Sequence, residues 1–249
     1  DIERLKKTLA GNFHDSLKCK THYSLAKLYT DAQDSANAVN NYFKGIEIAR
    51  AKKLHKLVAS GYKEVGFLYE LMNENLQALA FYRQAINYSK EYGLLPELGK
   101  AYKNTAFAYG NMGKLSTAVV YDDSTIAVYA RAGILIEKAN GLNNQGLRYH
   151  YLNKNELAMT NYQKALDLYE KLGEEKKKAN TVLNIGQIHL QQKNYDMALD
   201  FFLRAKDIAT RTSNLQSLAL AENNIGVTYF DQKKFAQAIP HFEKTQELS

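Results

Sequence analysis

The feature that most constrains this chain is a residue pattern that returns every forty positions, six times over. Small residues occupy one column of the pattern: Ala26, Gly66, Ala106, Gly146, Gly186 and Gly226. Twelve residues further on, every copy has an alanine: Ala38, Ala78, Ala118, Ala158, Ala198 and Ala238. Six copies in one register indicate a repeat protein, in which each unit packs only against its neighbours.

Two aromatic columns accompany the small residues. The first follows the small residue by three positions: Tyr29, Tyr69, Tyr109, Tyr149, His189 and Tyr229. The second follows the alanine by four positions: Tyr42, Tyr82, Asp122, Tyr162, Phe202 and Phe242. A ring approaches closely where the facing side chain is small, so the pattern predicts small-against-bulky contacts, each worth about 1.5–3 kcal/mol of burial. Asp122 interrupts the second column, which predicts a rotated or loosely packed helix at that point.

Each unit is expected to contain two helices. In the fifth copy, Tyr195, Ala198, Leu199 and Phe202 follow the i, i+3, i+4, i+7 spacing of an amphipathic helix. Only 2 of the 249 residues are proline, so few positions would break a helix. Glycine can close a helix in the left-handed conformation without steric cost, and a second glycine series marks the ends of three successive second helices: Gly93, Gly133 and Gly173.

These columns resemble those of the tetratricopeptide repeat. The match is best at 224–229, which reads Asn-Ile-Gly-Val-Thr-Tyr, and at 238–244, which reads Ala-Ile-Pro-His-Phe-Glu-Lys. The resemblance implies an all-α, right-handed solenoid of about six helix pairs. Its forty-residue period is similar to the longer-helix branch found in bacterial peptide receptors and signalling scaffolds, rather than to the family's usual period of 34.

The predicted domain boundaries follow from the columns. Residues 1–18 are expected to form an N-terminal helix or the remnant of a preceding repeat. Six units then follow, at about 19–58, 59–98, 99–138, 139–178, 179–218 and 219–249. No polar capping helix follows the sixth unit, although solenoids usually need one for solubility. We therefore expect a segment of a longer protein, or a homodimer that pairs end to end.

In the family that this chain resembles, the first helices line a concave groove that binds ligands. Carried over by position, the groove contains an asparagine column and its neighbours: Asn104, Asn144, Asn184, Asn224, Asn140, Asn143, Asn180 and Asn223, with Leu183, Gln187 and Leu220 beside them. Each carboxamide offers a donor and an acceptor, which suits the peptide units of an extended segment. The alternative is that these side chains bridge adjacent helices or face water.

Basic and aromatic side chains complete the candidate groove. Lys63, Lys100 and Lys103 are candidates to hold an acidic side chain or a terminal carboxylate, or else are solvated lysines. The chain has a net charge of +7, of which +5 lies in residues 1–60, where eleven Lys/Arg stand against six Asp/Glu. This basic end favours an acidic partner. The remaining candidates would supply apolar or ring contacts: Phe67, Phe107, His150, Tyr151 and Phe230.

Several classes of chemistry are not expected. Cys19 is the only cysteine and the six histidines are scattered, so we expect no metal site and no disulfide. No glycine loop suited to phosphates is present, and Asp122 and Asp123 point to different helix faces. We therefore expect no cofactor and no catalytic residues. No run of about 18 apolar residues exists, so membrane insertion is not expected.

The sequence predicts a non-enzymatic module that binds a peptide or protein segment, an acidic one included. By resemblance, it would be the sensor or interaction region of a bacterial regulatory protein, such as a two-component histidine kinase or a transcriptional regulator. The alternative is a passive scaffold for a multiprotein assembly. Single-stranded RNA binding is less favoured, because the basic residues form no continuous stripe. We expect a soluble protein of the cytoplasm or the periplasm.

Overall fold

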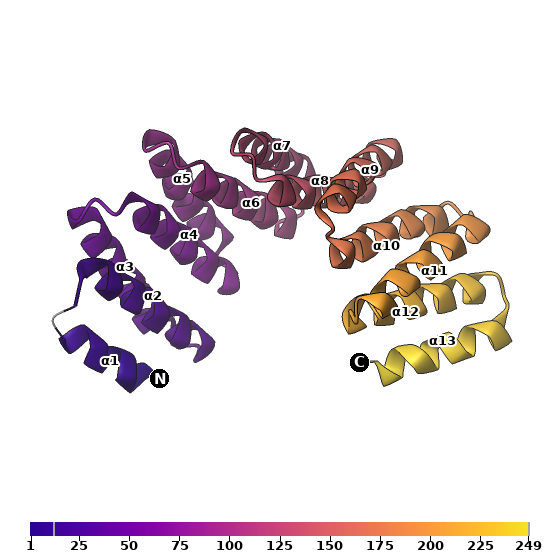
Figure 1. The fold of residues 1–249 in the computed structure, drawn as a ribbon, viewed down its shortest axis with the longest axis horizontal. Coiled ribbons are helices and arrows are strands. Elements are labelled where there is room, and N and C mark those ends of the chain that lie inside the picture. Colours follow the sequence, from indigo (N-terminus) through magenta and orange to yellow (C-terminus); the bar gives the residue numbers. More distant parts are fainter. Residues whose placement is uncertain (12, 249) are drawn as a thin grey trace. The chain divides into compact units, whose positions relative to one another are not determined.

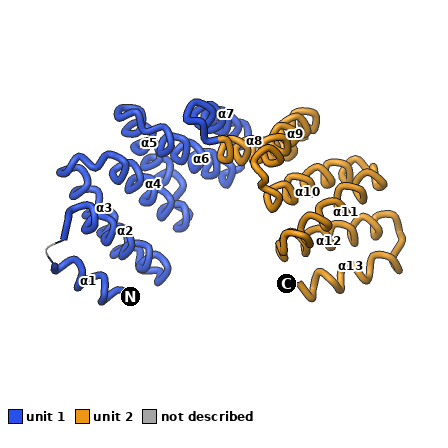
Figure 2. Tube along the Cα trace, in the orientation of Figure 1, with its two compact units in different colours: residues 1–134 blue, residues 135–249 orange. Residues whose placement is uncertain are grey.

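The computed structural model describes residues 1–11 and 13–248, so residue 12 of the predicted N-terminal segment and residue 249 of the predicted sixth unit lie outside it. The described residues form thirteen helices and no strand (Figure 1). They divide into two compact units, 1–134 and 135–249, which we describe separately (Figure 2). The predicted all-α class and the six helix pairs are confirmed.

Unit 1 consists of α1 (Ile2–Ala10) and three helix pairs. Its first helices are α2 (Asp15–Asp31), α4 (His55–Leu71) and α6 (Leu95–Asn111). Its second helices are α3 (Ser35–Ala51), α5 (Asn75–Glu91) and α7 (Leu115–Arg131). Each first helix packs on its own second helix, α4 and α6 also pack on the second helix before them, and α4 contacts α2 and α6. The first helices therefore form one surface of unit 1, and the second helices form another.

Unit 2 repeats the same plan with three pairs. Its first helices are α8 (Leu135–Tyr151), α10 (Glu175–Gln191) and α12 (Leu215–Asp231). Its second helices are α9 (Asn155–Leu172), α11 (Tyr195–Arg211) and α13 (Phe235–Glu247). Because α10 contacts both α8 and α12, these three helices form a continuous surface, which we call the first-helix face of unit 2.

A left-handed residue stands in the turn after each of the helices α2 to α12, once every twenty residues. Gly93, Gly133 and Gly173 have φ angles of 65°, 69° and 69°, as the glycine series predicted. The turns without glycine use other residue types in the same conformation: Gln33, Lys53, Asn73, Asn153, Lys193, Ser213 and Lys233. Helices α2 to α12 therefore have nearly the same length, which keeps the forty-residue columns in register.

The small-against-bulky contact is present in four pairs where glycine faces an aromatic ring. A Cβ atom on Gly66 would lie 2.6 Å from the ring of Tyr82, and the corresponding distance from Gly146 to Tyr162 is 2.7 Å. The other two pairs are Gly186 with Phe202 and Gly226 with Phe242. The rings of Tyr82, Tyr162 and Phe202 are fully buried, so these contacts form the core between paired helices.

The expectation of a rotated or loose helix at Asp122 is wrong. Asp122 is only 2% exposed, and α7 is as regular and as long as its counterparts. Tyr121 stacks on Tyr109 with ring centroids 5.3 Å apart, as Phe81 stacks on Tyr69 at 5.4 Å. The neighbouring ring thus holds α7 in the same rotation as α5, which explains why one substitution in the column does not disturb the helix.

The helix pairs begin four residues before the predicted unit boundaries. The first helices start at positions 15, 55, 95, 135, 175 and 215, whereas the predicted units started at 19, 59, 99, 139, 179 and 219. The prediction used the first small residue of each unit as its boundary. The preceding helical turn has no distinctive column, because its residues differ from copy to copy and are partly exposed.

Candidate functional site

A polar groove lies on the first-helix face of unit 2. It encloses about 250 Å³. Asparagine, glutamine and leucine side chains from α8, α10 and α12 line it: Asn143, Asn180, Leu183, Asn184, Gln187, Gln216, Leu220 and Asn224. None of these side chains is charged. Four of the predicted asparagines thus lie together, because residues three, four and forty positions apart fall on one face of stacked helices.

Asn143 connects α8 to α10. Its Oδ1 accepts a hydrogen bond of 2.9 Å from the hydroxyl of Thr181 and one of 3.4 Å from Nδ2 of Asn184. Thr181 is fully buried, and a buried hydroxyl normally has a hydrogen-bond acceptor within the protein because it is cut off from water. One carboxamide oxygen of the groove is therefore committed to holding two neighbouring repeats together.

Two further asparagines make bridges of the same kind. Asn180 on α10 accepts a 2.7 Å hydrogen bond from the hydroxyl of Ser217 on α12. Asn140 on α8 accepts from the hydroxyl of Tyr169 at 2.9 Å and from Nζ of Lys177 at 3.3 Å. The carbonyl oxygens of Asn140, Asn143 and Asn180 therefore bridge neighbouring helices, which is the alternative to ligand contact that the sequence left open.

Other amide groups of the groove make no hydrogen bond to protein. Among the residues that the structure describes, the side chains of Gln187, Gln216 and Asn224 form none. The side chain of Asn184 forms a hydrogen bond only through its amino group, which leaves its oxygen open. These groups keep donors and acceptors for a ligand or for water. The groove thus combines carboxamide oxygens that bridge neighbouring repeats with carboxamides that make no hydrogen bond to protein.

Six predicted residues of unit 2 do not line this groove, and Asn140, whose bridge is described above, is one of them. Asn144 and Asn223 are half-buried elsewhere on the same helices. His150 and Tyr151 lie at the end of α8, where Nδ1 of His150 is 3.2 Å from Oδ1 of Asn155, and the Tyr151 ring is 63% exposed. Phe230 lies at the end of α12 and packs edge-on against a ring of α13, with centroids 5.3 Å apart.

The predicted residues of unit 1 are distributed differently. Nζ of Lys63 forms an ion pair with Oε1 of Glu64 at 2.6 Å, so its charge is already balanced. Phe67 lines a small pocket between α2 and α4 of about 220 Å³, together with Glu64 and Leu71. Phe107 on α6 is 42% exposed and does not line this pocket.

Three more predicted residues lie on α6. Lys100 is exposed, Lys103 is half-buried, and neither lines the pocket between α2 and α4. Burial and a hydrogen bond to Glu70 raise the pKa of Tyr82, and the side chain of Asn104, which lies beside this buried hydroxyl, acts in the opposite direction. Unit 1 therefore has no asparagine groove like that of unit 2 among its described residues.

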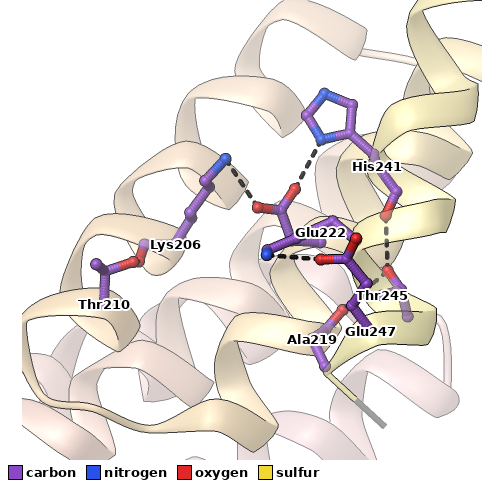
Figure 3. Close-up of polar contacts among 8 residues, drawn as sticks. Lys206, Thr210, Ala219, Glu222, His241, Thr245 and Glu247 are labelled. Atoms are coloured by element: carbon purple, nitrogen blue, oxygen red, sulfur yellow. Dashed lines mark hydrogen bonds and ion pairs between the residues drawn. The ribbon is translucent and has the colours of Figure 1, made fainter.

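A buried charge cluster lies between α12 and the second helices α11 and α13, and it has a different role. Glu222 on α12 has a side chain that is only 4% exposed. Its Oε1 is 2.8 Å from Nζ of Lys206 on α11, and its Oε2 is 2.7 Å from Nδ1 of His241 on α13 (Figure 3). Both carboxylate oxygens are thus used, and the cluster joins three helices rather than offering an open site.

Sequence reasoning did not single out Gln216 as a groove residue. Gln216 lies one helical turn before Leu220 on α12, so its spacing alone would have placed it on the same face. It was missed because its column contains unrelated residue types in the other copies. Within the described residues, no three His, Cys, Asp or Glu side chains gather as a metal site, and no helix is long and apolar enough to cross a membrane.

Comparison with known structures supports the helix-pair architecture. A signal-transduction ATPase from Pyrococcus horikoshii, described as having a tetratricopeptide repeat sensor, matches 99% of this chain with a TM-score of 0.81 and 16% identity, and the match covers 39% of that protein. BtubC from P. vanneervenii matches 84% of this chain and 89% of its own, with a TM-score of 0.73 and 20% identity.

A third similar structure contains a peptide. The Rap conjugation gene regulator of plasmid pLS20, solved in complex with the Phr* peptide, matches 99% of this chain and 69% of its own, with a TM-score of 0.62 and 16% identity. No curated protein sequence matches this chain significantly. Family models of the tetratricopeptide repeat match residues 139–172 and 178–249. The chain therefore contains tetratricopeptide repeats, and its helix pairs have the fold of a tetratricopeptide-repeat solenoid.

Proposed function

We propose that this chain is a non-enzymatic module that binds an extended peptide or protein segment in the asparagine-lined groove of unit 2. The observation that carries the proposal is the lining itself, which joins carboxamides from three successive repeats and contains no charged side chain. Carboxamides match the donor and acceptor of a peptide unit, so the groove suits the main chain of a ligand.

The expected energetics require an apolar contribution. A hydrogen bond contributes only about 1 kcal/mol net, and association costs several kcal/mol, so four or five amide contacts give weak binding by themselves. Leu220 is 47% exposed at the groove, while Leu183 is buried beneath it. An apolar ligand side chain placed on Leu220 would add affinity. The preferred ligand is therefore an extended segment with at least one apolar side chain.

The regulatory context of the proposal comes from the similar structures. One of them is described as having a tetratricopeptide repeat sensor, and another is a regulator in complex with a peptide. These descriptions support a role as the sensor or interaction region of a bacterial regulatory protein. An acidic ligand is not part of the proposal, because Lys63 is paired with Glu64 and the groove of unit 2 has no cation.

Selection from a random heptapeptide library displayed on phage tests this function. The library is selected on the full chain, on an Asn184→Ala/Asn224→Ala variant, and on a matched Asn223→Ala control that leaves the groove lining unchanged. We expect the full chain and the control to enrich the same peptides, and the double variant to lose them. Because no charge lines the groove, the affinity of the selected peptides should change little when salt is raised.

Two results would overturn the proposal. The first is enrichment of the same peptides on the double variant, which would place binding elsewhere on the molecule. The second is the absence of any enriched peptide on the full chain, provided that circular dichroism shows it to be fully helical. A passive scaffold predicts the second result, because its partners would dock on other surfaces.

A further inference from the structure

A second groove lies on the opposite set of helices in unit 1. It runs between α5 and α7, has α6 as its floor, and encloses about 600 Å³. Leu76 and Leu79 on α5 and Val120 on α7 border one part, while Tyr102 on α6 lies in the floor. All three helices belong to unit 1, so the groove is defined within a single compact body.

The repeats themselves show that the apolar border is unusual. Leu76 is 72% exposed and Val120 is 61% exposed. The residues that correspond to Leu76 in the other copies are small or acidic: Ala36, Ser116, Glu156, Asp196 and Ala236. Those that correspond to Val120 are Asn40, Ala80, Thr160, Asp200 and Pro240. Large apolar side chains thus face solvent at two positions where the other repeats avoid them.

One substitution explains why this groove is open. In the preceding pair of repeats, Phe43 projects from α3 and packs edge-on against Phe81 of α5, with ring centroids 5.9 Å apart. The residue that corresponds to Phe43 in the next repeat is Arg83, which lines the groove. The Phe43 ring therefore fills the space between α3 and α5, whereas Arg83 borders an open groove between α5 and α7.

The charge of the groove is entirely positive. Arg83 and Lys90 are its only charged lining residues. Arg83 has no ion-pair partner among the described residues, and Nζ of Lys90 lies 5.8 Å from the centroid of the Tyr102 ring. The corresponding stripe of α9 carries Asp167 and Glu170 instead. The positive charge on this stripe of α5 thus contrasts with the acidic stripe of α9, and it would complement a carboxylate.

Along α5, apolar side chains border one end of the groove, Arg83 stands midway and Lys90 lies at the other end. Leu76 stands in the first turn of α5 and Lys90 in its last, fourteen residues later. At 1.5 Å per residue, this stripe is about 21 Å long. Such a length accommodates about four turns of a ligand helix. A ligand that fits would place apolar side chains at the Leu76 end and carboxylates at the Lys90 end.

We propose that the groove between α5 and α7 is a second interaction site, which binds an amphipathic acidic helix of a partner protein. Apolar side chains of that helix cover Leu76, Leu79 and Val120, and its carboxylates pair with Arg83 and Lys90. The site is separate from the asparagine-lined groove, which belongs to α8, α10 and α12. One chain can then hold an extended segment in unit 2 and a helical partner in unit 1.

A pair of synthetic peptides tests this site on the full chain. The first is a fluorescein-labelled fourteen-residue helical peptide with a leucine stripe in its first half and three glutamates in its second half. The second has glutamines in place of the glutamates. Fluorescence anisotropy measures their binding to the full chain, to Arg83→Glu/Lys90→Glu, and to Lys164→Glu/Lys171→Glu, which makes the same charge change at exposed positions of α9.

We expect the glutamate peptide to bind the full chain and the α9 control about equally. Charge reversal at Arg83 and Lys90 should weaken it by about tenfold or more, since two favourable ion pairs become repulsive. The glutamine peptide should bind the full chain more weakly than the glutamate peptide. A Leu76→Ser/Val120→Thr variant, changed only at exposed positions, should weaken both peptides.

Three results would overturn the inference. These are equal affinity of the two peptides for the full chain, equal loss of binding in the Arg83→Glu/Lys90→Glu and α9 variants, and no binding of the glutamate peptide at millimolar protein. The Asn184→Ala/Asn224→Ala variant distinguishes the two sites, because it should lose library-selected peptides and retain the glutamate peptide.

Discussion

A Cβ atom placed on Gly186 would lie 2.5 Å from the nearest carbon of the Phe202 ring, which is fully buried. No side chain larger than hydrogen fits there unless one of the helices moves. The close approach of α10 and α11 therefore depends on this glycine, although glycine is a poor helix former. The same relationship in neighbouring repeats is what keeps the stack regular.

Gly186→Ala should destabilise the protein by about 1–3 kcal/mol, because overpacking a core contact costs more than the gain in helix propensity of about 1 kcal/mol. Urea unfolding followed by circular dichroism measures the change. A Gly186→Ala/Phe202→Leu double variant should recover part of the loss, since the smaller side chain makes room. If Gly186→Ala were to stabilise the protein, the close-packing explanation would fail.

The bridge between Asn143 and Thr181 should contribute to stability between repeats. Thr181→Val keeps the shape of the side chain but removes the hydroxyl that donates to Asn143 at 2.9 Å, and we expect a loss of about 1 kcal/mol. Thr210→Val is the control, because that exposed hydroxyl bonds only to a carbonyl of its own helix, and its effect should stay within about 0.5 kcal/mol. Equal effects of the two substitutions would show that the bridge adds nothing.

The Glu222 cluster predicts a dependence of stability on pH. Burial raises the pKa of Glu222, but hydrogen bonds from Lys206 and His241 outweigh it and leave the pKa below its ordinary value of 4.5. Since the folded state has the lower pKa, the carboxylate stabilises the protein above pH 4.5, and this contribution is lost as the pH falls through the folded-state value.

The corresponding measurement is the urea midpoint between neutral pH and about pH 3 for the full chain and for Glu222→Gln, with the pH range chosen around the carboxylate pKa. Glu222→Gln should lower the midpoint at neutral pH and lose less stability on acidification. Parallel pH curves for the two proteins would contradict the role assigned to this carboxylate.

The repeat columns predicted the fold well, because each column corresponds to one packing contact. Gly66 and Tyr82 meet as expected, and Gly93 closes its helix with a positive φ. The left-handed conformation of Lys193 was not predicted, because lysine gives no signal for it. The expected rotation or loose packing of α7 was wrong, since the stacking of Tyr121 on Tyr109 compensates for Asp122.

The candidate site was predicted only in part. Asn143, Asn184 and Asn224 line one groove, since their spacing places them on one face of stacked helices. Tyr151 and Phe230 lie at helix ends, away from that groove, and sequence periodicity does not distinguish a helix end from its centre. Which carboxamide atoms would be used in bridges between repeats also required the structure, because it depends on partners thirty or more residues away.

The central claim is that open carboxamides on α10 and α12, in the groove that α8 completes, bind the main chain of an extended segment. The most direct measurement is an N-methyl scan of a library-selected heptapeptide, in which each backbone amide is methylated in turn and affinity for the full chain is measured by calorimetry. We expect methylation of the central amides to weaken binding by about fivefold to tenfold each, the equivalent of one lost hydrogen bond. Affinity that is unchanged at every methylated position would contradict the account.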